Sequence, residues 1–191
     1  DIIDASNLER SLYLATQIRE LDCKVVFALN MADLARSRGI LIDGEKLSEL
    51  LAVPVVFTIG NKGEGIDELL QKAVELAESR EGIPQKRKVK YSKDIEEAIS
   101  RLQEFIEARI DGGFPYNTRW TAIKLLEDDK IVKERIAQKT GSQAAEILAL
   151  ADTLRKHLMR RFDDDPQIVM TDERYGFIAG IVREVQSTSL Q

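Results

Sequence analysis

Short apolar runs alternate with helical patterns along residues 1–79, and this alternation constrains the fold more than any other feature of the sequence. The runs occupy residues 1–4, 24–29 and 53–58. The last two are apolar on nearly consecutive positions, as in parallel strands that are buried on both faces. A helical pattern follows each run, ending near Leu21, Leu51 and Ser79. Strands that alternate with helices predict an open α/β sheet with right-handed parallel crossovers.

The first helix is expected to begin at a capping box. Ser6 is the expected N-cap residue, and Glu9 follows it three positions later. In such a box the serine hydroxyl and the glutamate each accept a hydrogen bond from a backbone N–H of the first turn. The sequence therefore predicts that the helix starts directly after Ser6.

The second half of the chain has helical patterns and no convincing strand. Residues 94–109 carry apolar side chains at helical spacing. Further helices are predicted over residues 119–126, 130–139, 142–162 and 172–185. Gly82-Ile83-Pro84 and the basic residues after it are typical of a domain boundary. The expected architecture is α/β over residues 1–83, followed by an all-α bundle over residues 84–191.

The composition excludes several classes of function. With 28 Lys and Arg against 33 Asp and Glu, the net charge of −5 argues against non-specific nucleic-acid binding. A single Cys and a single His are too few for a disulfide framework or a Cys/His zinc site. No apolar run approaches the roughly 20 residues of a membrane-spanning helix, and the N-terminus has no signal-peptide pattern. We expect a soluble, intracellular protein that binds no nucleic acid and has no resident metal site.

Two loops follow the buried strands, at the edge where an open α/β sheet binds its ligands. The first reads Asn30-Met31-Ala32-Asp33, and the second reads Thr58-Ile59-Gly60-Asn61-Lys62-Gly63. An ionised Asp33 can accept from both the N1–H and the N2–H donors of guanine, whereas adenine lacks that pair of donors. Asn30 can donate to the base and also tie its loop to the neighbouring one. The backbone N–H of Gly60 is expected to donate to guanine O6, because glycine permits close approach of the backbone.

The alternative interpretation of the first loop is structural. Asn and Asp are common in turns and at helix N-caps, so Asn30 and Asp33 can serve only to begin the next helix. The loop follows a buried strand, and it precedes a Gly/Lys loop by one strand–helix unit. This placement favours recognition of a purine base.

Three segments of the first half match a known family in their order along the chain. They read Asp4-Ala5-Ser6-Asn7-Leu8-Glu9-Arg10, Ala28-Leu29-Asn30-Met31-Ala32-Asp33 and Lys62-Gly63-Glu64-Gly65-Ile66-Asp67-Glu68-Leu69. They resemble the cytosolic G domain of FeoB, the bacterial ferrous-iron transporter family, and Met31 is a specific mark because most small GTPases have Lys there. Segments of the second half resemble the helical domain that follows this G domain. They are Arg119-Trp120, Lys124-Leu125-Leu126-Glu127, Asp172-Glu173-Arg174-Tyr175 and Phe177-Ile178.

The resemblance implies a guanine nucleotide, GTP or GDP, as the ligand of the intact protein. It assigns the binding site to Asn30, Met31, Asp33, Thr58, Ile59 and Gly60. Ile59 and Gly60 depart from the Thr-Ser-Ala pattern that is common in the family's second loop. The backbone role of the third position can survive in Gly60, whereas any contribution of a hydroxyl at the second position is lost.

The phosphate-binding motif Gly-x-x-x-x-Gly-Lys-Ser/Thr does not occur in the sequence. That motif holds the phosphates with backbone N–H groups and a lysine, and its hydroxyl binds Mg²⁺. In FeoB-like proteins the motif lies in a segment that would precede Asp1. We therefore expect residues 1–83 to be the C-terminal part of a P-loop GTPase-like sheet. We assign no catalytic residue, expect no GTP hydrolysis by this chain alone, and expect Mg²⁺ to bind only together with the missing segment.

For residues 84–191 the resemblance implies a helical GDI-like domain that leads toward a membrane region. The expected function is guanine-base recognition combined with coupling of the nucleotide state to Fe(II) transport, at the cytoplasmic face of the cell inner membrane. The expected partners are the N-terminal half of the G domain and the membrane-spanning region of the same polypeptide, and homo-oligomerisation is left open. The alternatives are a nucleotide-independent helical adaptor with a degenerate GTPase remnant and an Era-like GTPase fragment that acts on RNA.

Overall fold

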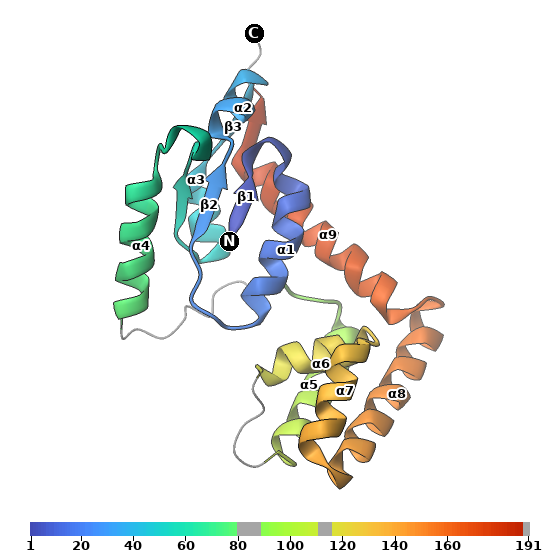
Figure 1. Cartoon of the computed structure of the whole chain (residues 1–191). Helices are drawn as coiled ribbons and strands as arrows, with labels where there is room; N and C mark the ends of the chain where they lie inside the picture. Colours follow the sequence, from blue (N-terminus) through green and yellow to red (C-terminus); the bar gives the residue numbers. More distant parts are fainter. Residues whose placement is uncertain (80–88, 111–115, 189–191) are drawn as a thin grey trace. The chain divides into compact units, whose positions relative to one another are not determined.

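The computed structural model describes residues 1–79, 89–110 and 116–188 (Figure 1). It divides the chain into two compact units. The first unit comprises Asp1–Val89 and Tyr175–Gln191, and the second comprises Lys90–Arg174. Helix α9 (Pro166–Val185) therefore contributes residues to both units.

A three-stranded parallel sheet forms the centre of the first unit (Figure 1). Its strands are β1 (Ile2–Asp4), β2 (Phe27–Asn30) and β4 (Val55–Phe57), in the order β1-β2-β4. Ile3 pairs with Leu29 in one ladder, and Leu29 pairs with Phe57 in the next. A separate antiparallel sheet joins β3 (Ile40–Ile42) to β5 (Gln186–Thr188). The predicted α/β class with parallel strands is confirmed.

Helices and short turns connect the strands of the first unit. They are η1 (Ala5–Asn7), α1 (Leu8–Glu20), α2 (Ala32–Ser37), α3 (Gly44–Leu51), η2 (Gly60–Lys62) and α4 (Ile66–Glu78). The hydrophobic core joins the sheet to α1, α3 and the C-terminal part of α9. Its members include Ile3, Leu12, Leu29, Leu47, Ile178 and Ile181. Burial of these apolar side chains fixes β1 and β2 against the helices, and so fixes the strand end that carries the first loop.

The predicted start of the first helix is wrong. Ser6 does not cap the helix. Asp4 is instead the N-cap residue of the turn η1, and its Oδ1 accepts from both the N–H and the hydroxyl of Ser6 at 2.8 Å. This contact stabilises the turn η1, so that α1 starts only at Leu8. Asn7 is its N-cap residue and makes no capping hydrogen bond through its side chain. The aspartate at the end of β1 reaches the turn first, because it lies directly before it.

The second unit is a helical bundle, as the sequence predicts. Its helices are α5 (Lys93–Glu107), α6 (Thr118–Leu126), α7 (Lys130–Thr140), α8 (Ser142–Phe162) and the N-terminal part of α9. The interior contains apolar side chains together with the buried charged side chains of Glu127, Arg155 and Arg174. Arg174 is 1% exposed, and its Nη2 donates to Glu127 Oε1 and to the Tyr91 hydroxyl, both at 2.8 Å. These charge-assisted bonds compensate the cost of burying the guanidinium.

Several short elements of the described residues are not predicted from the sequence. They include α2, β3 and β5. The expectation that the second half contains no strand is wrong, because Gln186–Thr188 pairs with Ile40–Ile42. The segment Gln-Ser-Thr is polar and has no strand pattern of its own, so its conformation comes from pairing with a distant segment. Residues 175–188, which the sequence analysis assigns to the helical half, belong to the first unit in the structure.

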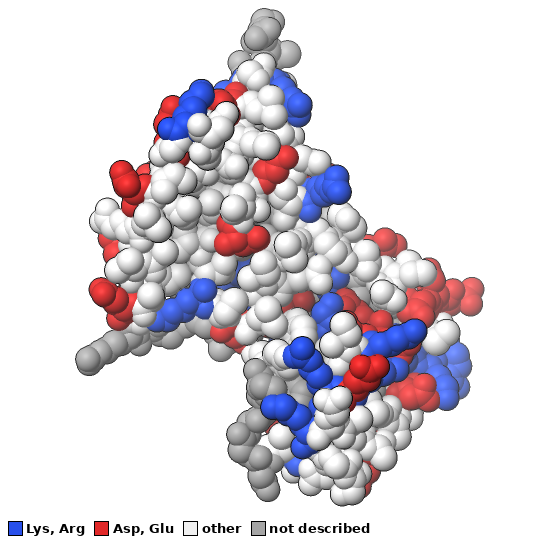
Figure 2. Space-filling model, in the orientation of Figure 1, with Lys and Arg blue, Asp and Glu red and all other residues white. Residues whose placement is uncertain are grey.

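Charged side chains are interleaved on the face of the molecule shown in Figure 2. Over the helical unit, Lys and Arg alternate with Asp and Glu instead of gathering in one basic stripe on this face. Over the described residues, no helix combines the length and the apolar sequence that crossing a membrane requires. The same residues contain no cluster of three or more metal-ligating side chains of the His, Cys, Asp and Glu types.

Candidate functional site

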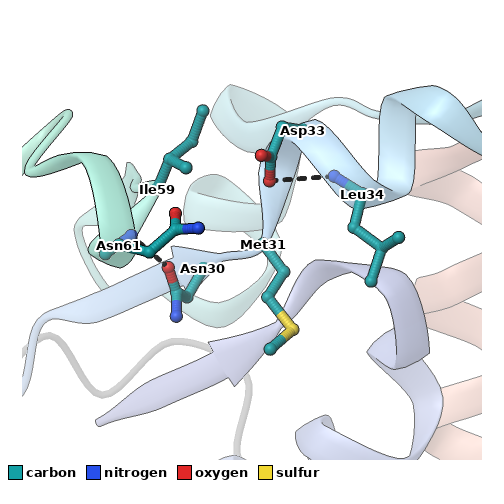
Figure 3. A pocket seen from close by; sticks show the side chains of 7 residues that line it. Asn30, Met31, Asp33, Leu34, Ile59 and Asn61 are labelled. Atoms are coloured by element: carbon teal, nitrogen blue, oxygen red, sulfur yellow. Dashed lines mark hydrogen bonds between the residues drawn. The ribbon is translucent and has the colours of Figure 1, made fainter.

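A cavity of about 340 Å³ lies at the carboxyl ends of β2 and β4, where the two predicted loops meet (Figure 3). It is lined by Asn30, Met31, Asp33, Leu34, Ile59, Gly60 and Asn61. In the view of Figure 3, Asp33 and Met31 lie on one side and Ile59 and Asn61 on the other. Five of the six predicted site residues therefore line one cavity. The sixth, Thr58, is buried and holds a neighbouring residue in place.

The first loop turns sharply between β2 and α2. Asn30 is the last residue of β2, and Met31 adopts the left-handed conformation with φ of 60°. This turn places Asp33 in the first turn of α2. The side chain of Met31 is exposed, which is common for a residue at the rim of a ligand site. The backbone thus presents Asn30 and Asp33 to the same cavity although they are three positions apart.

Asn30 ties the two loops together, as the sequence analysis expects. Its Oδ1 accepts from the backbone N–H of Gly60 at 3.0 Å and from the Thr58 hydroxyl at 3.2 Å. Both bonds use the oxygen of the Asn30 amide. The two N–H donors of this amide are on Nδ2, and we expect Nδ2 to donate to a base. The Gly60 N–H, predicted as a donor to guanine O6, donates to Asn30 in this structure. That prediction for Gly60 stays a prediction.

Asp33 is partly exposed, and its carboxylate contacts Leu34 and Lys62. Oδ1 accepts from the backbone N–H of Leu34 at 2.9 Å, and Oδ2 lies 3.3 Å from Nζ of Lys62. Desolvation raises the pKa of Asp33, but the hydrogen bond from Leu34 and the Lys62 ammonium together lower this pKa below its usual value. The side chain is therefore a carboxylate at neutral pH, which is the form that accepts two hydrogen bonds.

The second loop is held against the end of the sheet by backbone contacts. The N–H of Thr58 donates to Leu29 O at 2.9 Å, which continues the ladder one residue beyond β4. Ile59 forms an isolated bridge with Glu64, so the loop closes on itself before α4 begins. These contacts place Ile59, Gly60 and Asn61 opposite the first loop.

Two lining residues and one partner of the site are missed by the sequence analysis. Leu34 and Asn61 line the cavity, and Lys62 contacts Asp33. Asn61 directly follows Gly60, so its place in the second loop could have indicated that it lines the cavity. The Lys62 contact spans 29 positions along the chain, and no local pattern indicates it. The site offers hydrogen-bond acceptors, donors and apolar walls, which suits recognition of a flat polar ring and not covalent chemistry.

Two family models match this chain. The model described as FeoB cytosolic helical domain matches residues 91–187, and the model described as Ferrous iron transport protein B matches residues 1–73. Among curated proteins, the Fe(2+) transport protein A/Fe(2+) transporter FeoB fusion protein of Porphyromonas gingivalis is 34% identical over 99% of this chain. The Fe(2+) transporter FeoB of Escherichia coli is 31% identical over 98% of this chain. This chain spans 22% of the length of each.

Solved structures of the same cytosolic region match both units. A point mutant of S. thermophilus NFeoB bound to GDP is 32% identical, with a TM-score of 0.78, and the match covers 97% of this chain and 67% of that one. The cytosolic domain of L. pneumophila FeoB is 29% identical with a TM-score of 0.78, covering 98% of this chain and 66% of the other.

Proposed function

Since the chain belongs to the FeoB family of ferrous iron transport proteins, we propose that its cavity recognises the guanine base of GTP or GDP. The observation that carries the proposal is that Asn30 and Asp33 line the same cavity as Gly60 and Asn61 of the second loop. Related structures support it, because S. thermophilus NFeoB has been solved with GDP and with GMPPNP.

The proposed base contacts follow from the chemistry of the donors and acceptors. The two oxygens of Asp33 accept from N1–H and N2–H of guanine as a pair of charge-assisted bonds. Nδ2 of Asn30 donates to the base. Guanine O6 accepts from the second loop, either from the Gly60 N–H, which donates to Asn30 in this structure, or from Asn61, which lines the same cavity. Met31 and Ile59 provide apolar contact. Adenine presents no donor pair to Asp33, so we expect discrimination between the two purines.

We further propose that residues 1–83 are the C-terminal portion of a larger G domain. Ile2, Ala28 and Val56 form one row on the sheet face opposite the core; Ala28 and Val56 are buried, whereas Ile2 is 73% exposed. In the described residues β1 is an edge strand that pairs with β2 alone. An exposed apolar residue on an edge strand supports the presence of a further strand and helix in the intact protein.

Helix α4 supports the same proposal. It is amphipathic, yet none of its residues is buried, and Leu70 and Val74 are 60% and 54% exposed. These two residues are four positions apart and share one face of the helix. Helices of this length gain most of their stability from packing an apolar face. The additional segment is the natural occupant, since about a third of each solved relative's chain lies outside the match.

The proposed function of this chain is recognition and not hydrolysis. The missing segment would supply the phosphate-binding motif, the Mg²⁺ ligand and the groups that position the attacking water. Base contacts contribute about 1–3 kcal/mol each and are offset by the cost of ordering the ligand. A net free energy of about −4 kcal/mol corresponds to a millimolar dissociation constant. We expect weak base binding and no GTP turnover by the isolated chain.

We propose that the helical unit, Lys90–Arg174, belongs to a GDI-like domain that links the G domain to the membrane-spanning region of the same polypeptide. In the intact protein this places both domains at the cytoplasmic face of the cell inner membrane. The nucleotide state would then regulate Fe(II) transport. The proposal rests on the match of residues 91–187 to the FeoB helical domain and on the full-length relatives, which are Fe(2+) transporters.

A nucleoside titration followed by two-dimensional NMR tests the base-recognition proposal. Guanosine at millimolar concentration is expected to shift the signals of residues lining the cavity, whereas adenosine is not. Asp33→Ala should abolish the guanosine shifts. Asp152→Ala, which removes another exposed carboxylate on α8, is the control and should leave them unchanged. Equal shifts with guanosine and adenosine would contradict the proposed discrimination by Asp33, and no shift with either nucleoside would favour the nucleotide-independent adaptor.

A further inference from the structure

Two contacts join the loops of the cavity, and they differ in position. Asn30 contacts Gly60 and Thr58 at the strand ends, where the bond from the Thr58 hydroxyl is part-buried and the bond from the Gly60 N–H is exposed. The contact between Asp33 and Lys62 lies at the rim and is exposed to solvent. Lys62 is the last residue of η2, whose backbone is fixed by the bond from the Lys62 N–H to Ile59 O at 2.9 Å.

The Lys62 ammonium contacts the Asp33 carboxylate, and Lys62 itself does not line the cavity. Its neighbour Asn61 does line the cavity. The ammonium therefore leaves the space for a flat ring unoccupied. It is also the charged group that faces Asp33 in the described part of the chain.

The carboxylate has enough acceptor sites for Lys62 and a base together. Two carboxylate oxygens offer about four lone-pair positions. The Leu34 N–H and the Lys62 ammonium occupy one on each oxygen. Neither contact exhausts the acceptor capacity of its oxygen, so the carboxylate can still accept hydrogen bonds from guanine. Lys62 and guanine are thus compatible partners of Asp33, and not competitors for it.

We propose that Lys62 is a positioning residue for Asp33: it holds the carboxylate in the orientation that receives a guanine base. This inference rests on the proposed function of the cavity. Without Lys62, the exposed side chain of Asp33 is held on one oxygen only, by its own helix, and can rotate away from the cavity. Part of the base affinity is then spent on restoring the orientation.

The size of the effect follows from the exposure of the pair. Exposed ion pairs contribute little, so we expect Lys62→Gln to weaken guanosine binding by about two- to five-fold. Salt screens such a pair strongly, and the Debye length falls to about 3 Å at 1 M. Guanosine carries no charge. Its affinity for the wild-type chain should therefore fall by about the same factor in 1 M NaCl, whereas the affinity of Lys62→Gln should not change with salt.

The test compares guanosine dissociation constants from NMR titrations of the full chain. Lys62→Arg keeps the charge and should retain most of the wild-type affinity. Lys72→Gln is the matched control, because Lys72 forms an exposed ion pair with Glu75 on α4, away from the cavity. It should leave both the affinity and its salt dependence as in the wild type.

A pH series supplies a readout that a merely structural role would not change. Guanosine binding requires ionised Asp33, so it is lost as the pH falls through the pKa of that group. Lys62 is one of the groups that lower this pKa. In Lys62→Gln the loss should begin at a higher pH than in the wild type.

Two results would overturn the inference while leaving the proposed function intact. Equal affinity and equal salt dependence of Lys62→Gln and wild type, with binding still abolished by Asp33→Ala, would show that Lys62 does not orient Asp33. Tighter guanosine binding by Lys62→Gln would show that Lys62 and the base compete for Asp33. The absence of any guanosine response in the wild type would overturn the proposed function and this inference together.

Discussion

Gly65 lies against the backbone of Phe57 so closely that a Cβ at position 65 would be 2.1 Å from the Phe57 carbonyl oxygen. Gly65 also has a φ of 78°, and it is the N-cap residue of α4. The loop that follows β4 can therefore return over the strand end only because this position has no side chain. Gly63 shares the positive φ but has no atom within 4 Å of its virtual Cβ.

We predict that Gly65→Ala destabilises the first unit by about 3 kcal/mol. The left-handed conformation accounts for about 1–2 kcal/mol, and the clash with a backbone oxygen that cannot move away adds a similar amount. Urea unfolding followed by the NMR signals of β2 measures the change. Gly63→Ala is the control and should cost only about 1 kcal/mol. Equal costs for the two variants would contradict the role assigned to the Phe57 contact.

Gly60 differs from Gly65, and we predict that Gly60→Ala is tolerated. A Cβ at this position would lie 3.5 Å from Asn30 Oδ1, which is an ordinary contact distance. Alanine reduces the freedom of the unfolded chain, so we expect a stabilisation of about 0.4–1 kcal/mol in the same urea experiment. The amide signal of residue 60 should keep the position expected for a donor to Asn30. A destabilised variant would mean that the loop needs a conformation that alanine cannot adopt.

The site could be predicted from the sequence only where its residues lie at the ends of regular strands. Asn30 and Asp33 follow an apolar run, so the strand end and the loop are both visible in the pattern. Asp33 contacts Lys62, which is 29 positions away along the chain. Gly60 contacts Asn30, which is 30 positions away. Such contacts depend on the order of strands in the sheet. β5 shows the same limit, because its strand conformation depends on β3 and not on its own residues.

We predict that replacing the exposed apolar residues of α4 costs little stability in this chain. Leu70→Ser with Val74→Ser should change the free energy of unfolding by less than about 1 kcal/mol, because neither residue is buried. The double variant should also bind less of a hydrophobic fluorescent dye. Leu47→Ser on α3 is the contrasting control, since Leu47 is fully buried in the core. A large loss of stability in the α4 variant would show that the helix face is already packed and needs no further segment.

The pair Glu96–Arg119 gives the helical unit a stability that depends on pH. Each oxygen of Glu96 accepts from one Arg119 Nη at 2.8 Å, and Oε1 also accepts from the Tyr91 N–H. Desolvation raises the pKa of Glu96, but these hydrogen bonds and the positive charge of Arg119 lower it below the usual value of 4.5. A group with a lowered folded pKa stabilises the fold above its unfolded pKa. This stabilisation is lost as the pH falls through the lower, folded pKa.

We therefore predict that Glu96→Gln destabilises the helical unit by about 1–2 kcal/mol at pH 7, since it weakens a paired charge-assisted contact. The difference between wild type and variant should shrink as the pH falls below about 4.5 and the wild-type carboxylate becomes protonated. The fluorescence of Trp120, the single tryptophan, reports the unfolding of this unit in urea. Glu97→Gln is the matched control, because the neighbouring Glu97 pairs with Lys93 in an exposed position. It should change the stability by no more than about 0.5 kcal/mol at any pH. A Glu96→Gln difference that stays constant down to pH 3 would mean that the lost stability comes from packing and not from the charge of Glu96.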